Sequence, residues 1–381
     1  MLLGVDHLFF YLYLKNVIFA ELYLKWVPMQ NLFFSILLVW FANQLFAQEI
    51  NSTSIAPQLS VFAQSKHQWT GIAVSGSGRV FVNFPRWSAE TPVSVAEIVN
   101  GQIIPYPNRE WNNWNNGTNK THQFICVQSV FIDDLNLLWI LDTGQELQSD
   151  STKAAHLYVF SLKTNRLEQE YTLPAAKISG KSYLNDLRID HKKQVVYLTD
   201  SDVGGLVILD LQTNEIRRVL EKHYSTRAEV SKITIDGYVR THPVNSDGIA
   251  LDRGNRYLYY SSLMGENVYR IATKALLNKN LNDSLLGTQV EKFAKTGAND
   301  GIIFDKKGNL YLTSLEKNGI SRLDKRGRLQ LLIQDDAIKW PDSFAFEPNG
   351  DLLFTISQIH LPKEKRGPYK IFRLKLTALK K

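Results

Sequence analysis

Hydrophobic and polar residues alternate in short runs along most of the chain, and the residues between these runs are typical of turns. In residues 126–144, CVQSVFIDDLNLLWILDTG, two apolar runs flank a polar turn that contains Asp133, Asp134 and Asn136. Two short β-prone runs around such a turn predict a β-hairpin. One hairpin cannot bury both of its faces, so this unit needs neighbours of the same kind.

The same pattern recurs five more times along the chain. The six copies begin at Thr70, Gln128, Asn185, Asp247, Asp300 and Asp342. Successive starts are 42 residues (Asp300 to Asp342) to 62 residues (Asn185 to Asp247) apart. Units of about 40–50 residues with four strands each are typical of propeller blades, and loop insertions lengthen them. We therefore predict an all-β fold, a six-bladed β-propeller over residues 59–381. A β-sandwich is the alternative, but sandwiches seldom repeat one motif six times.

Strands at the two ends of this region predict how the ring closes. Residues 59–62 precede the first copy, and residues 369–376 follow the last. We expect the later strand to complete the last blade and the early strand to pair with that blade, which removes an exposed sheet edge. Two smaller elements are also predicted: a hairpin turn at Asn100-Gly101 and one short helix within residues 272–289 that ends at Gly287.

Residues 1–47 do not share the repeat. The stretch from Met29 to Ala47 has a short polar start, an apolar core and a small residue before Gln48. These features predict a secretory signal that is cleaved after Ala47, with translation starting at Met29. Residues 48–58 are then a polar leader, and the mature protein is secreted or periplasmic without a membrane contact. The alternative is a membrane anchor built from the apolar runs of residues 1–47.

Charge and cysteine content exclude several function classes. The chain has 44 basic and 37 acidic residues, a net charge of +7, and its basic residues are scattered rather than gathered in a patch. Nucleic-acid binding normally requires such a patch, so we expect no nucleic-acid partner. Cys126 is the only cysteine, so no disulfide can form within the chain, and its apolar strand predicts a buried side chain rather than a nucleophile.

The starts of the six copies are the candidate binding site. In a propeller the first strand of each blade lines the central channel, so these positions should meet at one mouth, where a small-molecule ligand can bind. The residues concerned are Thr70, Gln128, Asn185, Asp247, Asp300 and Asp342. Three carboxylates and two carboxamides around one axis favour a cation, either a hard ion such as Ca²⁺ or the ammonium group of an amine. The alternative is that each Asp caps a turn of its own blade.

Two other groups of residues are weaker candidates. His242 lies five residues before Asp247, so either side chain could act as an acid or base at the mouth. Trp111 and Trp114 lie in a polar loop over residues 105–121. An aromatic side chain on such a loop can contact a ligand, or it can plug the rim of the propeller.

Several segments resemble the yellow and major royal jelly protein family, in the same order from about residue 59 to residue 375. They are EWN at 110–112, VQSV at 127–130, LWILDTG at 138–144, YLTDS at 197–201, DGIA at 247–250 and WPDSF at 340–344. The resemblance implies a six-bladed propeller and a secreted protein. Members of this family include dopachrome-converting proteins, binders of biogenic amines and nutritional proteins. The chain lacks the paired cysteines of the insect members, so it is more similar to a bacterial relative.

The repeat starts at Asp247 and at Asn299-Asp300 also resemble those of the gluconolactonase and regucalcin propellers. That resemblance implies a divalent metal held by Asn185, Asp247 and Asp300, but Thr70 stands where those enzymes place an acidic ligand. The leading hypothesis is therefore a secreted, yellow-related propeller that binds a small aromatic or amine ligand and isomerises a dopachrome-like compound. The alternatives are a metal-dependent lactonase and a non-catalytic binding scaffold.

Overall fold

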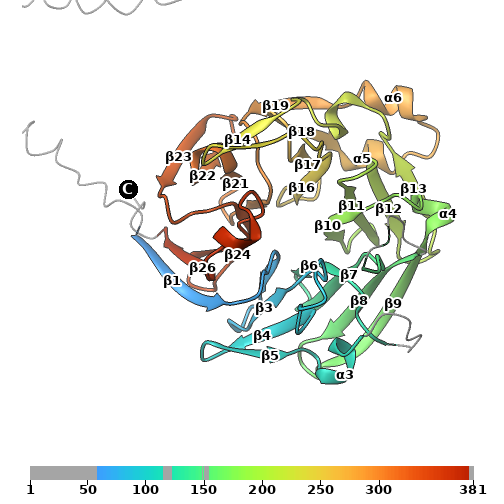
Figure 1. Ribbon diagram of the computed structural model, residues 1–381. Coiled ribbons are helices and arrows are strands. Elements are labelled where there is room, and N and C mark those ends of the chain that lie inside the picture. Colours follow the sequence, from blue (N-terminus) through green and yellow to red (C-terminus); the bar gives the residue numbers. More distant parts are fainter. Residues whose placement is uncertain (1–57, 115–121, 148, 150–153, 377–381) are drawn as a thin grey trace, which may run out of the picture. The chain divides into compact units, whose positions relative to one another are not determined.

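The computed structural model describes residues 58–114, 122–147, 149 and 154–376. Within this part of the chain, six four-stranded antiparallel sheets form a ring, with one sheet for each predicted blade (Figure 1). The six-bladed β-propeller is thus confirmed. The predicted signal and leader segments lie outside the described residues, except for Gln58 at the start of the first strand.

Each sheet is built from strands that follow one another in the chain, apart from the last sheet. The first three sheets contain β2 (Ile72–Val74), β3 (Val80–Asn83), β4 (Val95–Val99), β5 (Gln102–Pro105); β6 (Val127–Ile132), β7 (Leu137–Asp142), β8 (Ala154–Ser161), β9 (Arg166–Pro174); and β10 (Leu184–Asp190), β11 (Val195–Asp200), β12 (Leu206–Asp210), β13 (Ile216–Val219). The other three contain β16 (Ser246–Leu251), β17 (Tyr257–Ser262), β18 (Asn267–Ala272), β19 (Glu291–Lys295); β20 (Ile302–Phe304), β21 (Leu310–Ser314), β22 (Gly319–Leu323), β23 (Leu329–Gln334); and β24 (Pro341–Phe346), β25 (Leu352–Ile356), β26 (Tyr369–Lys375), β1 (Gln58–Ser65).

The ring closes through its first and last strands. β1 pairs with β26, from Gln58 opposite Lys375 to Ser65 opposite Tyr369. Figure 1 shows these two strands side by side, the first in blue and the last in red. This pairing confirms both strands predicted at the ends of the propeller region.

The core is divided among the contacts between sheets. Each pair of neighbouring sheets shares one cluster of buried hydrophobic side chains, and six such clusters run around the ring. The cluster between the third and fourth sheets, for example, contains Tyr197, Tyr260 and Tyr269. Large aromatic side chains fill the space between twisted sheets, which explains the 11% aromatic content of the sequence.

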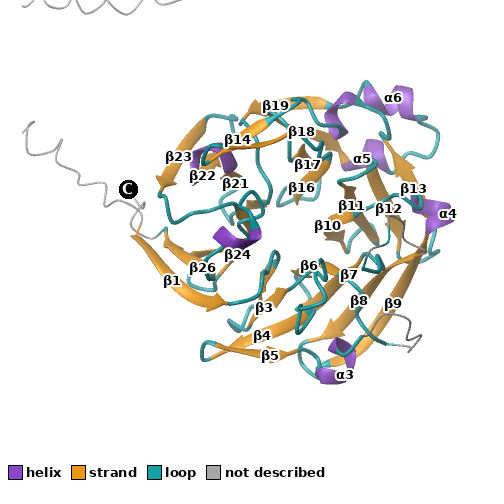
Figure 2. Ribbon diagram, in the orientation of Figure 1, coloured by secondary structure: helices purple, strands orange, loops and turns teal. Residues whose placement is uncertain are grey.

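Short helices and turns join the strands (Figure 2). The predicted turn is present, with φ of 50° at Asn100 and 78° at Gly101. The single helix expected within residues 272–289 is instead two, α5 (Thr273–Leu276) and α6 (Asp283–Gly287). The mostly polar residues 278–282 interrupt it, because Asn282 accepts a hydrogen bond from the amide of Leu285 and so starts a new helix. The remaining short helices are α3 (Arg109–Asn112), α4 (Ala175–Ile178), η1 (Tyr224–Thr226), η2 (Leu315–Lys317) and η3 (Lys363–Lys365).

One hairpin does not belong to any blade. β14 (Ile233–Ile235) and β15 (Tyr238–Arg240) form a separate two-stranded sheet within the long insertion between β13 and β16. Ile233 and Ile235 pack in a seventh hydrophobic cluster that also contains Trp340. No helix among the described residues is long and apolar enough to cross a membrane.

Candidate functional site

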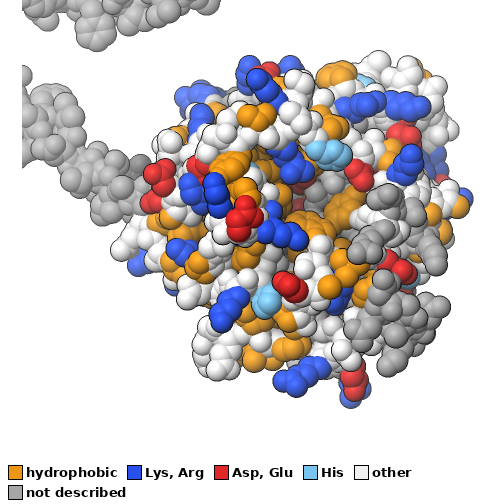
Figure 3. Space-filling model, viewed as in Figure 1, with side chains coloured by type: hydrophobic (Ala, Val, Ile, Leu, Met, Phe, Trp, Pro, Cys, Tyr) orange, Lys and Arg blue, Asp and Glu red, His pale blue; other side chains and the backbone are white. Residues whose placement is uncertain are grey.

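The structure brings the six repeat starts together around one cavity of about 310 Å³. Figure 3 shows the hollow at the centre of the ring, with hydrophobic, basic and acidic side chains around it. The predicted residues in its lining are Thr70, Gln128, Asn185, Asp247, Asp300, Asp342 and His242. The three Asp side chains are at least nine-tenths buried, whereas His242 is exposed at the rim.

Glycine and hydroxyl side chains hold the repeat starts close to one another. A Cβ atom on Gly248 would lie 2.4 Å from the carbonyl oxygen of Asp300, and one on Gly301 would lie 2.3 Å from that of Asp342. Only glycine therefore lets these backbones approach so closely. Thr199, in the second strand of its blade, donates a hydrogen bond of 2.7 Å to the carbonyl oxygen of Asp247. The Asp-Gly pairs in the sequence thus reflect the spacing between neighbouring blades.

A chain of hydrogen bonds crosses the lining and ends at Asp247. Trp87 Nε1 donates to the hydroxyl of Tyr183 at 2.7 Å, and this hydroxyl donates to Gln128 Oε1 at 2.7 Å. Gln128 Nε2 donates to Asn185 Oδ1 at 3.1 Å. Asn185 Nδ2 then donates to Asp247 Oδ2 at 2.7 Å. Because every donor in this chain points toward Asp247, the chain favours a negative charge on that carboxylate.

The three aspartates nevertheless have raised pKa values. Burial, with the nearby charges of Asp342 and Asp186, raises the pKa of Asp247 to about 8. Burial and the charge of Asp247 raise the pKa of Asp300 well above its ordinary value, and burial and the charge of Asp300 do the same for Asp342. Three buried carboxyl groups this close together cannot all be ionised without a cation among them.

Arg240 is the basic side chain that faces these carboxyl groups. The charges of Asp300 and Asp247 act to raise its pKa, but burial has the larger effect and lowers it. Its guanidinium lies over the ring of Trp340, 5.7 Å from the centroid, and Trp340 Nε1 donates to Asp300 Oδ2 at 2.8 Å. Arg240 Nε is buried and has no hydrogen-bond partner among the described residues. The cation and the carboxyl groups thus share one cavity without forming an ion pair.

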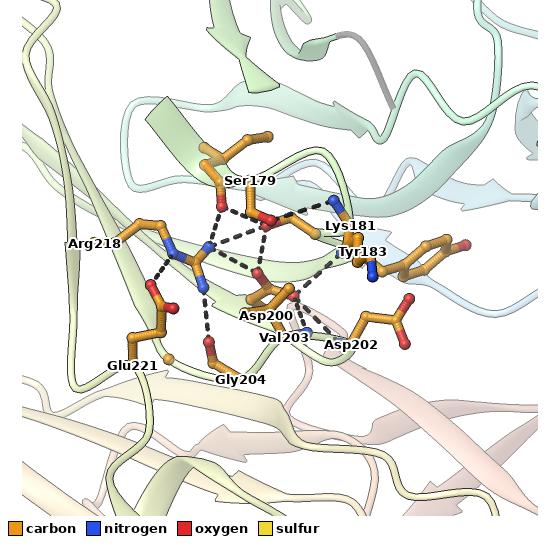
Figure 4. A network of polar contacts seen from close by, with 12 residues as sticks. Ser179, Lys181, Tyr183, Asp200, Asp202, Val203, Gly204, Arg218 and Glu221 are labelled. Carbon is orange, nitrogen blue, oxygen red and sulfur yellow. Dashed lines mark hydrogen bonds and ion pairs between the residues drawn. The ribbon is translucent and has the colours of Figure 1, made fainter. Parts of the chain in front are cut away.

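A second polar network supports the edge of the cavity (Figure 4). Asp200 accepts hydrogen bonds from the backbone amides of Tyr183 and Asp202, at 3.1 and 3.2 Å, and both of these residues line the cavity. Arg218 Nη1 donates to Asp200 Oδ2 at 2.8 Å. The network therefore holds two loops of the mouth in place.

Trp111 and Trp114 do not line the cavity. Trp111 lies in α3, whose first turn is capped by Asn108, and packs against Phe124 and Tyr158. Trp114 lies beside the guanidinium of Arg86, 5.6 Å from its ring centroid. Both rings are at least nine-tenths buried. This placement corrects the expectation that either tryptophan contacts a ligand at the mouth, because their loop buries its aromatic residues against blades one and two.

The predicted metal ligands do not fit a divalent ion as they are arranged. Asn185 Oδ1 accepts from Gln128, Asn185 Nδ2 donates to Asp247, and Asp300 Oδ2 accepts from Trp340. Across the described ranges, no three His, Cys, Asp or Glu side chains are grouped so that they could hold a metal ion. Cys126 is buried, as expected, and burial raises the pKa of its thiol to about 11.

Four aromatic or basic residues of the lining were not predicted from the sequence: Trp87, Tyr183, Arg240 and Trp340. Tyr183 and Trp340 each lie two residues before a repeat start, Asn185 and Asp342, so an aromatic residue at this offset was the available signal. Trp87 and Arg240 come from connections whose course the repeat does not determine.

Comparisons with known proteins agree with this architecture. Major royal jelly protein 3 of Apis mellifera is 23% identical over 235 residues, which cover 60% of this chain and 42% of that protein. Protein yellow of Drosophila pseudoobscura pseudoobscura is 25% identical over 301 residues, which cover 71% of this chain and 49% of that protein. The chain thus spans about half the length of the curated relatives it matches.

A gluconolactonase from Xanthomonas campestris has a similar structure, with a TM-score of 0.51, 13% identity, and coverage of 84% of this chain and 90% of that one. At this identity the likeness shows a shared fold alone. The family described as "Major royal jelly protein" matches residues 125–352, which is more than half of the chain and extends from β6 to the start of β25. The chain therefore belongs to the major royal jelly protein family.

Proposed function

We propose that this protein is a secreted propeller that binds a small aromatic amine in the cavity at the channel mouth. The observation that carries the proposal is the group of three buried carboxyl groups, Asp247, Asp300 and Asp342, around one cavity. The ammonium group of a ligand would supply the positive charge that allows these groups to ionise.

The walls of the cavity favour an aromatic ligand. The aromatic residues Trp87, Tyr183 and Trp340 belong to the lining. Trp87 is 41% exposed, so its ring is accessible from solvent. Aromatic faces attract both cations and other rings, and their burial provides most of the affinity for a flat ligand.

Isomerisation of a dopachrome-like compound is the reaction that this site would support. Such a reaction removes a proton from one carbon of the ligand and returns a proton elsewhere, without oxidation. Asp247, with a pKa of about 8, has the proton affinity that a group exchanging protons near neutral pH requires. His242 at the rim is the second candidate for this role.

Secretion is supported by the signal-like stretch from Met29 to Ala47 and by the family to which the chain belongs. The sequence of the first residues of the protein collected from culture medium tests it, and we expect Gln48 at the N-terminus. Retention of residues 1–28 in the exported protein would contradict the signal peptide.

Isothermal titration of the purified protein with tyramine, dopamine and tryptamine tests binding. We expect saturable binding that weakens about ten-fold or more in Asp247→Asn, because this variant removes the ionisable group. Asp134→Asn, in an exposed turn, is the matched control and should bind as the wild type does. Absence of binding by all three amines would reject the proposal. A chelatable divalent ion in the purified protein would instead favour the hydrolase hypothesis.

A further inference from the structure

Arg240 is a charged side chain inside the cavity whose hydrogen-bonding capacity is unused. The guanidinium has five N–H donors, and its Nε is buried without an acceptor. Across the described part of the chain, its guanidinium forms neither a hydrogen bond nor an ion pair. It makes a cation–π contact with the ring of Trp340. A buried donor without a partner is costly, so its retention beside a cavity indicates that a ligand supplies the acceptor.

The hairpin that carries Arg240 is held at several points, so the side chain is not free to leave. Asp236, in the turn between β14 and β15, accepts from Lys339 Nζ at 2.8 Å and from His360 Nε2 at 3.0 Å. The hydroxyl of Tyr238 accepts from Lys365 Nζ at 2.9 Å. Together with the hydrophobic cluster beneath β14, these contacts fix the position of Arg240 over the mouth.

Arg240 and the three aspartates line the same cavity of about 310 Å³. No ion pair joins Arg240 to any of these aspartates, although the charges of Asp300 and Asp247 act on it. A ligand that carries a cation and an anion on neighbouring atoms would satisfy both sides at once. The planar guanidinium fits a carboxylate, which can accept two parallel hydrogen bonds from it.

We propose that Arg240 is a specificity-determining residue that receives a carboxylate, and that the preferred ligands are aromatic α-amino acids rather than simple aromatic amines. The amino group of such a ligand faces Asp247 and Asp300, its carboxylate faces Arg240, and its ring lies among the aromatic walls. This inference rests on the proposed function, because it names the class of ligand for the same cavity.

Titration calorimetry with matched ligand pairs tests the inference, with tyrosine against tyramine and tryptophan against tryptamine. Each pair differs only in the carboxylate. The wild type should bind each amino acid about ten-fold or more tightly than its amine. In Arg240→Met, which retains an unbranched apolar stem over Trp340, the ratio of amino-acid affinity to amine affinity should fall to about one. Arg240→Lys keeps the positive charge but lacks the planar guanidinium with its two parallel donors, so it should retain only part of the preference.

Arg256→Met is the control, because Arg256 is an exposed arginine in the turn before β17 and should leave every affinity unchanged. Wild-type protein that binds the amines but prefers no amino acid would overturn the inference and leave the proposed function standing. An unaltered preference in both Arg240 variants would also overturn it. Failure of all four ligands to bind would reject the proposed function, and the inference with it.

Discussion

Two arrangements of a buried aspartate and a half-buried arginine lie at the same mouth, and they differ in how completely they are paired. In the first, Arg218 uses its donors on Asp200, Ser182, Glu221 and two backbone carbonyl groups (Figure 4). In the second, Arg240 faces Asp247 and Asp300 without an ion pair or a hydrogen bond from its guanidinium among the described residues. Both arrangements combine an arginine with aspartate, so residue type alone does not distinguish them.

We infer from this difference a structural role for Arg218 and Asp200, and it supports the proposed binding role of Arg240. A fully paired charge network is complete without a ligand and fixes the loops that it joins. An incompletely paired one lowers the stability of the free protein, and a ligand that supplies the missing groups can recover that free energy on binding. Pairing within the protein, rather than the type of residue, is therefore the feature that supports the proposed binding site.

The largest expected difference in the free energy of unfolding is between the same substitution, Arg to Met, at positions 218 and 240. Arg218→Met leaves Asp200 buried without its cation, so we expect a loss of about 3–5 kcal/mol in the free energy of unfolding. Arg240→Met removes a cation that has no ion pair or hydrogen bond and keeps an apolar stem over Trp340, so its loss should be below about 1 kcal/mol. Urea denaturation of the two variants measures both values. Equal losses would break the comparison.

The pH dependence of stability should show a further effect at the second arrangement. Folding raises the pKa of Asp247 from 3.8 to about 8, so the folded protein holds a proton that the unfolded chain has lost. The stabilisation from this proton is complete below pH 3.8, decreases as the pH rises, and is gone above about 8.

Relative to Asp247→Asn, the wild type should therefore lose stability between pH 5 and pH 8, by no more than about 1.4 kcal/mol per pH unit, and then level off. Thermal melts of both proteins at each pH give this difference. A stability difference between the two proteins that stays constant over the range would show that Asp247 titrates normally.

The smallest expected effect is that of Asp300→Asn. Burial and the charge of Asp247 raise the pKa of Asp300 well above its ordinary value, which favours the neutral carboxyl group, and an amide can replace that form. The amide oxygen can still accept from Trp340, and the free energy of unfolding should change by less than about 1 kcal/mol. Asp200→Asn, which breaks an ion pair with Arg218, should lose more. Melting curves that rank the two variants in the opposite order would contradict this assignment.

The repeat carried most of what could be predicted about the fold. Alternating strands and Asp- or Gly-containing turns occur six times, and each copy became one blade with its first residue at the cavity. This worked because blades bury their faces only against their neighbours, so the position of a residue within its repeat determines its position in the ring.

Residues outside the repeat could not be placed in the same way. Arg240 reaches the cavity because an inserted hairpin folds back over the mouth, and only contacts with distant residues such as Lys339 and His360 determine that course. Trp111 is the opposite case, because it was expected at the cavity and is not there. Its polar loop resembles a ligand-binding loop but turns the ring inward against Phe124. Local sequence describes such segments as loops without giving their direction.

The pairing of β1 with β26 has a consequence for the order of folding. Residues 58–65 are synthesised before every other strand of the ring, yet their partners at residues 369–375 are synthesised after all the others. β1 therefore has no partner until β26 has been made. Until then the last blade is incomplete, and so are its interfaces with the blades on either side. Contacts between such distant residues slow folding. A ring fastened in this way cannot gain or lose stability one blade at a time, as an open array of repeats can.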